Sequence, residues 1–93
     1  MTERITPLSQ PRLPRGVKLK RDEVRGQWTL LAPERIFRID APAAAILELC
    51  DGARTLDAIV DQLAAKFSAD RAVIARDVTA MLEDLVAKRV VEA

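Results

Sequence analysis

The hydrophobic pattern changes its period once along the chain, near Asp40, and this change limits the fold more than any other feature. Before Asp40, apolar residues alternate with polar ones, as they do in half-buried strands. After it, they recur every three or four residues, as on one face of a helix. Strands therefore precede helices, and this order predicts an α+β domain.

Two of the expected strands form a hairpin. In GVKLKRD, which begins at Gly16, Val17 and Leu19 alternate with lysines. After a loop, GQWTLLA places Trp28 and Leu30 on one side of a second strand. The two segments together predict an antiparallel pair.

A third strand follows a turn at Ala32-Pro33-Glu34, where Pro33 favours type I geometry. ERIFRID then predicts a strand from Arg35 to Ile39. If the strands form a meander, one edge of the third strand has no neighbour, so its backbone donors and acceptors are free. This sheet edge is the first candidate binding feature of the chain.

Three amphipathic helices are expected after the sheet, each with its own start signal. Asp40 caps the first, with Pro42 tolerated in its opening turn, and Gly52 ends it. Thr55 caps the second, and Ser68 or Asp70 opens the third, which ends near Arg89. The apolar stripes are Ala43, Ile46, Leu47 and Cys50; Leu56, Ile59, Val60, Leu63 and Phe67; and Ile74, Val78, Met81, Leu82 and Leu85. The fold class is thus a three-stranded antiparallel sheet followed by three helices, similar to a winged helix-turn-helix.

Ninety-three residues fit a single domain, which we place at residues 16–93. Residues 1–15 carry three prolines among polar and basic residues and predict a flexible N-terminal tail. No apolar run is long enough for a membrane span and no secretory leader is evident, so we expect a cytoplasmic protein. The pattern leaves the state open between monomer and dimer.

The residue types that the chain lacks exclude most kinds of catalytic, metal and phosphate-binding site. With no His and one Cys, the chain cannot form a Ser-His-Asp triad, a Cys-His dyad or a His-bearing metal site. Its three glycines stand too far apart for a phosphate loop. We therefore predict no enzyme, with no catalytic, cofactor-binding or metal-binding residues. Cys50 shares a helical face with Ile46 and Leu47 and is expected to be buried.

DNA and peptide are the two ligands that such a frame accommodates. A DNA-reading helix needs an excess of Lys or Arg, whereas the second helix holds Asp57 and Asp61 against Lys66 alone, and the third is balanced. Peptide binding by strand addition needs only a free edge and a side-chain groove. The third strand beside an amphipathic helix that carries Met81 meets that need.

The segments PRGVKLKRDEVRGQWTLLAPERIFRID, ILELCDGARTLDAIVDQLAAKF and DVTAMLEDLVAKRVV resemble the PqqD family of pyrroloquinoline quinone (PQQ) biosynthesis. The resemblance covers the chain from about Pro14 onward. It implies a non-catalytic peptide chaperone without a cofactor. Family members bind the precursor peptide PqqA and present it to the radical S-adenosylmethionine enzyme PqqE, which cross-links a Glu and a Tyr.

In related recognition domains the peptide joins the third strand and lies against the third helix. Carried onto this chain, the implied peptide-binding residues are Arg35, Ile36, Phe37, Arg38, Ile39, Val73, Asp77, Ala80, Met81, Asp84 and Leu85. Of these, Arg35 and Arg38 are expected to select acidic side chains, while Phe37, Met81 and Leu85 also suit a core. A DNA-binding winged-helix regulator and a purely structural docking subunit remain the alternatives.

Overall fold

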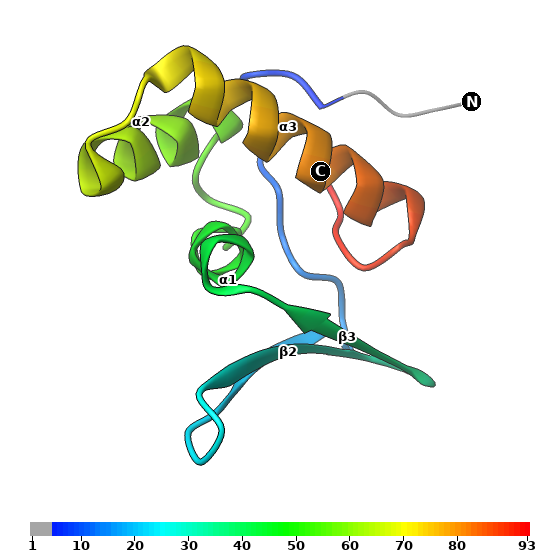
Figure 1. The fold of residues 1–93 in the computed structure, drawn as a ribbon. Coiled ribbons are helices and arrows are strands. Elements are labelled where there is room, and N and C mark those ends of the chain that lie inside the picture. The colour runs from blue at the N-terminus through cyan, green and yellow to red at the C-terminus, as the bar shows by residue number, and fades with distance from the viewer. Residues whose placement is uncertain (1–4) are drawn as a thin grey trace.

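A computed structural model describes residues 5–93. Its elements are β1 (Lys18–Asp22), β2 (Gln27–Ala32), β3 (Arg35–Ile39), α1 (Ala41–Glu48), α2 (Leu56–Phe67) and α3 (Arg71–Ala87). Figure 1 shows the sheet at one end of the molecule, with all three helices on the same side of it. The predicted fold class is confirmed. Within residues 5–93, no helix combines the length and apolar character that crossing a membrane requires.

The sheet is an antiparallel meander with the strand order β1-β2-β3. Its register aligns Leu19, Leu30 and Phe37 across the three strands on the face that meets the helices. Leu30 is 0% exposed and is the sheet's main anchor in the core. The opposite face carries the alternate residues, and no helix covers it in Figure 1.

The turn between β2 and β3 differs from the predicted type I geometry. Glu34 has a φ of 62°, whereas both central residues of a type I turn have negative φ. The proline at position 33 sets only its own φ. The turn type is decided by Glu34, which adopts a left-handed conformation. Because glutamate rarely adopts this conformation, the sequence gives no indication of it.

The predicted helix caps are confirmed. Asp40, Thr55 and Asp70 each occupy an N-cap position and accept a hydrogen bond from the first turn of the following helix. Ser68 instead ends α2 in a left-handed conformation, with a φ of 50°. The third helix ends at Ala87, close to the expected Arg89.

Two details of the helical prediction were wrong. The first helix ends at Glu48, before Gly52, because residues 49–55 form a connection in which Gly52 has a φ of 80°. Phe67, assigned to the apolar stripe of α2, is 50% exposed, because α2 ends there and its last turn extends beyond the core.

Residues 5–15 do not form the expected free tail. Ile5 is 8% exposed and belongs to the core. The carbonyl oxygens of Pro7 and Ser9 accept hydrogen bonds from the amides of Asp57 and Leu56 at 3.0 and 2.7 Å. These amides lie in the first turn of α2, where a helix offers no internal acceptor. We call residues 5–12 the strap; residues 1–4 of the predicted tail lie outside the described part.

The strap also joins the end of the chain. Arg12 and Glu92 exchange two backbone hydrogen bonds, at 2.8 and 2.9 Å, and their side chains form an ion pair. Val90 and Val91 beside this bridge are buried. Proline prevents helix in the strap, but its extended backbone still pairs where apolar side chains hold it.

Candidate functional site

The outer edge of β3 carries backbone donors and acceptors that no other strand of the described sheet pairs. β3 pairs with β2 on one side, and among residues 5–93 no other backbone hydrogen bond involves residues 35–39. In a hairpin with a two-residue loop the closing pair, here Ala32 and Arg35, is hydrogen-bonded, and the pairs then alternate. Ile36 and Arg38 therefore direct their backbone groups toward the free edge.

The side chains of β3 divide between two faces. Ile36 and Arg38 lie on the uncovered face, where Ile36 is 72% exposed. Phe37 and Ile39 are half-buried and pack against the core from the other face. Arg35 shares that inner face, with its guanidinium carbon 5.5 Å from the centre of the Phe37 ring.

The predicted residues on α3 form a second, mixed surface. Val73 is 42% exposed, and Asp77, Ala80 and Asp84 are exposed along the same side of the helix. Met81 is half-buried, which suits either of its proposed roles. Leu85 is 8% exposed and belongs to the core, so it offers little surface to a ligand.

β3 and α3 do not pack directly against each other to any large extent. α3 packs chiefly on α2, and the sheet meets the helices chiefly through α1, which contacts β1 and β2. Both elements nevertheless contribute to one core, with Phe37 and Met81 at its margin. The structure thus places the predicted residues on two surfaces of one domain, joined through the core.

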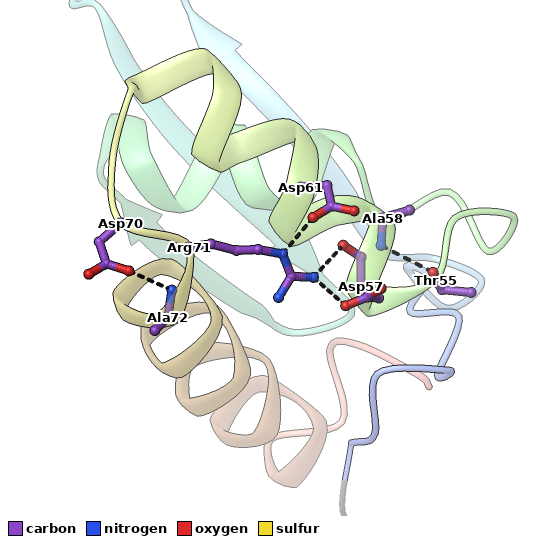
Figure 2. A network of polar contacts seen from close by, with 7 residues as sticks. All are labelled: Thr55, Asp57, Ala58, Asp61, Asp70, Arg71 and Ala72. Atoms are coloured by element: carbon purple, nitrogen blue, oxygen red, sulfur yellow. Dashed lines mark hydrogen bonds and ion pairs between the residues drawn. The ribbon is translucent and has the colours of Figure 1, made fainter.

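Charges on the helices are largely satisfied by one another. Figure 2 shows Arg71, the first residue of α3, between Asp57 and Asp61 of α2. Its Nε lies 2.5 Å from Asp61 Oδ1, and hydrogen bonds to both carboxylates raise the pKa of the Arg71 guanidinium above its ordinary value. Lys88 pairs in the same way with Asp84, at 2.8 Å. Paired cations of this kind make a poor phosphate-binding face.

Cys50 is buried, as predicted. Its Sγ donates to the Ile46 carbonyl oxygen at 3.3 Å, and burial, assisted by the Asp51 carboxylate, raises the pKa of the thiol to about 12. A thiol that keeps its proton is a weak nucleophile and a weak metal ligand. Among residues 5–93 no group of His, Cys, Asp and Glu side chains is arranged to hold a metal ion.

One surface was missed by the site prediction. The uncovered sheet face joins Ile36 and Arg38 to Leu31 of β2 and to Lys18 and Lys20 of β1, through the registers 18–31–36 and 20–29–38. A shallow hollow of about 520 Å³ lies over much of this face. The alternation of lysines in β1 was visible in the sequence, but the cross-strand register that gathers these residues was not.

The fold and this edge define a class of protein: a small strand-first domain that displays a sheet edge flanked by apolar and cationic side chains. Residues 27–91 match the family described as Coenzyme PQQ synthesis protein D (PqqD). The chain belongs to the PqqD family.

Relatives and solved structures agree. The PqqA binding protein of Rhodopseudomonas palustris (strain BisB5) is 55% identical over 84 residues, which are 90% of this chain and 82% of that protein. The solution NMR structure of the PqqD truncation of Methylobacterium extorquens PqqCD is described as a functional, stand-alone recognition element for ribosomally synthesized and post-translationally modified peptides. It matches with a TM-score of 0.84 and 46% identity over 96% of this chain and 95% of that chain. The crystal structure of PqqD from Xanthomonas campestris matches with a TM-score of 0.61 and 39% identity, over 96% and 99% of the two chains.

Proposed function

We propose that this protein is a non-catalytic, cytoplasmic peptide chaperone of PQQ synthesis, which binds the precursor peptide PqqA and presents it to PqqE for cross-linking of a Glu and a Tyr. The supporting observation is the free edge of β3, with exposed Ile36 and Arg38, in a chain that belongs to the PqqD family. Relatives that carry the name PqqA binding protein support the same ligand.

The peptide would bind as an additional strand. Its backbone would pair with Ile36 and Arg38, whose donors and acceptors face the edge, and backbone pairing of this kind supplies affinity without requiring a particular sequence. Arg35, Phe37 and Ile39 would contact it from the inner face, and the surface of Val73, Asp77, Ala80, Met81 and Asp84 on α3 would contact the part of the peptide that leaves the sheet. The protein itself would supply position rather than chemistry.

An NMR titration of isotope-labelled protein with unlabelled PqqA tests this proposal. We expect saturable amide shifts concentrated in Arg35–Ile39 and on α3, and slower hydrogen exchange at the amides of Ile36 and Arg38. A PqqA analogue that is N-methylated at the residues facing the edge should lose binding, whereas methylation of the alternate residues should be tolerated.

The same sample separates this function from its alternatives. Binding to PqqE without any response to PqqA would identify a structural docking subunit. Duplex DNA binding that weakens steeply with salt would identify a regulator. To test presentation, cross-linking of PqqA by PqqE should depend on the added protein and fall with a variant that does not bind the peptide.

A further inference from the structure

The two faces of β3 differ in what their cations already contact. On the inner face, Arg35 lies over Phe37 at 5.5 Å, and Arg21 of β1 lies over Trp28 at 5.7 Å, which are distances of cation–π contact. On the outer face, Lys20 and Arg38 make neither an aromatic contact nor an ion pair within residues 5–93. Of the two arginines of β3, Arg38 is the one whose guanidinium has no aromatic contact in the described part of the chain.

Arg38 also has an apolar neighbour in a fixed position. Ile36 stands two residues away on the same face and is 72% exposed, which is unusual for a branched apolar side chain. Leu31 of β2 lies opposite Ile36 and extends this apolar surface. One cationic contact and one apolar contact therefore stand side by side along the outer face of the edge strand.

A strand added to this edge would have side chains at the same two-residue spacing as Ile36 and Arg38. Its side chains alternate between the faces, so those two positions apart lie beside Ile36 and Arg38, with Cβ atoms about 5 Å from their partners. The residue between them points to the inner face, beside half-buried Phe37. An acidic side chain would satisfy Arg38, and an apolar one would cover Ile36.

We propose that the edge selects extended peptides in which an acidic residue and a large apolar residue are separated by one residue, with the acidic side chain on Arg38 and the apolar side chain on Ile36. This inference rests on the proposed function and specifies its ligand. It also assigns the charge selectivity to Arg38 rather than to Arg35, whose guanidinium lies over the Phe37 ring on the inner face.

Double-mutant cycles with PqqA test the inference. Each Asp and Glu of the peptide is replaced in turn by Lys, and binding to the wild-type protein and to Arg38→Glu is measured by isothermal titration calorimetry. We expect Arg38→Glu to weaken binding of unmodified PqqA about tenfold, as a like-charge contact at an exposed edge should. One Lys-substituted peptide should regain most of that loss with Arg38→Glu and not with Arg35→Glu. Lys20→Glu, two strands from the edge, is the matched control and should change affinity less than threefold.

The spacing is read from a second cycle. Ile36→Ser is combined with peptides in which each large apolar residue is replaced by Ala, and the position that couples to Ile36 should lie two residues from the one that couples to Arg38. Coupled positions one or three residues apart, or rescue at Arg35 instead of Arg38, would overturn the inference while strand addition stands. If unmodified PqqA does not bind the wild-type protein at all, the proposed function fails and this inference fails with it.

Discussion

The helical layer and the sheet of this domain are built in opposite ways. Every ion pair described within residues 5–93 lies in the helices, their connections, the strap or the chain end, and none lies in the sheet. The helices are capped by Asp40, Thr55 and Asp70, and the strap supplies acceptors to α2. The sheet meets the rest of the molecule through one face only (Figure 1).

This difference indicates that the paired groups mainly stabilise the fold, whereas the unpaired groups of the sheet are available to a ligand. Backbone groups and charges that are already paired contribute to stability and have little left to offer a partner. Unpaired ones, such as the edge of β3 and the guanidinium of Arg38, cost little while they remain in water and gain more when a ligand pairs them. Changes at the helix caps and at the ion pairs of Arg71 should therefore affect folding, whereas changes on the outer sheet face should affect binding.

The largest effect is expected where the sheet enters the core. Leu30→Ala should destabilise the protein by about 3 kcal/mol, because it removes a fully buried side chain and leaves a cavity. Leu31→Ala, one residue along on the outer face, is the matched control and should cost less than about 1 kcal/mol. Urea unfolding followed by circular dichroism measures both. Equal losses would mean that the outer face is as structural as the inner one.

A smaller effect tests whether the strap belongs to the helical layer. Ile5→Ala should cost about 2 kcal/mol, because Ile5 is 8% exposed and packs in the core. Leu8→Ala is the control in the same segment, since Leu8 is 81% exposed. Thermal and urea unfolding compare the two variants. A mobile tail, as the sequence alone indicates, would make both substitutions neutral.

Alkaline pH tests the burial of Cys50 in the connection after α1. The folded thiol has a pKa of about 12 because of its burial and the nearby Asp51 carboxylate, whereas the unfolded thiol titrates near its ordinary value of 9.0. Above pH 9 the unfolded state binds fewer protons at this thiol than the folded state does. The contribution of the protonated thiol to the free energy of unfolding is therefore complete below pH 9 and declines as the pH rises toward about 12. At pH 10 the loss is about 1.4 kcal/mol.

Cys50→Ala supplies the control for this pH dependence. The variant starts from a lower stability but lacks the thiol, so its unfolding free energy should change less between pH 8 and pH 10. The chain has no Tyr, and its four lysines, all exposed, are the same in both proteins. Urea titrations at the two pH values, with reductant present, measure the difference. Parallel losses in both proteins would show that the thiol is not the group responsible.

Sequence reasoning was most accurate where the signal is local. The bounds of β3, Arg35–Ile39, and the three N-caps follow from alternation and capping chemistry within a few residues. The prediction of a free tail failed because residues 5–9 are held by groups about fifty or more positions away in sequence. Pro7 and Ser9 accept from amides of α2, and the Ile5 amide donates to the Glu83 carboxylate. No sequence pattern within residues 1–15 indicates that these residues contact such distant partners.

The features of the candidate site likewise divide into those that follow from local sequence patterns and those that depend on contacts between elements. The free edge of β3 follows from a meander order, and alternation places Ile36 and Arg38 on one face of the strand without showing that this face is the exposed one. The choice between Arg35 and Arg38 could not be made from sequence, because it depends on the contact between Arg35 and the Phe37 ring. The uncovered face needed the register of three strands, which alternation within each strand does not fix.

The smallest expected effect isolates charge itself. Arg71→Met removes the cation that links Asp57 and Asp61 (Figure 2) and should lower the thermal midpoint slightly, because exposed ion pairs contribute little. The difference from wild type should shrink in 1 M NaCl, where the Debye length is about 3 Å. Its affinity for PqqA should not change. Arg38→Met should show the reverse, with an unchanged midpoint and weaker, salt-sensitive peptide binding. Calorimetry and thermal unfolding at two salt concentrations give both quantities for each variant. If either variant changed stability and affinity together, the separation between a self-paired helical layer and a ligand-facing sheet would be wrong.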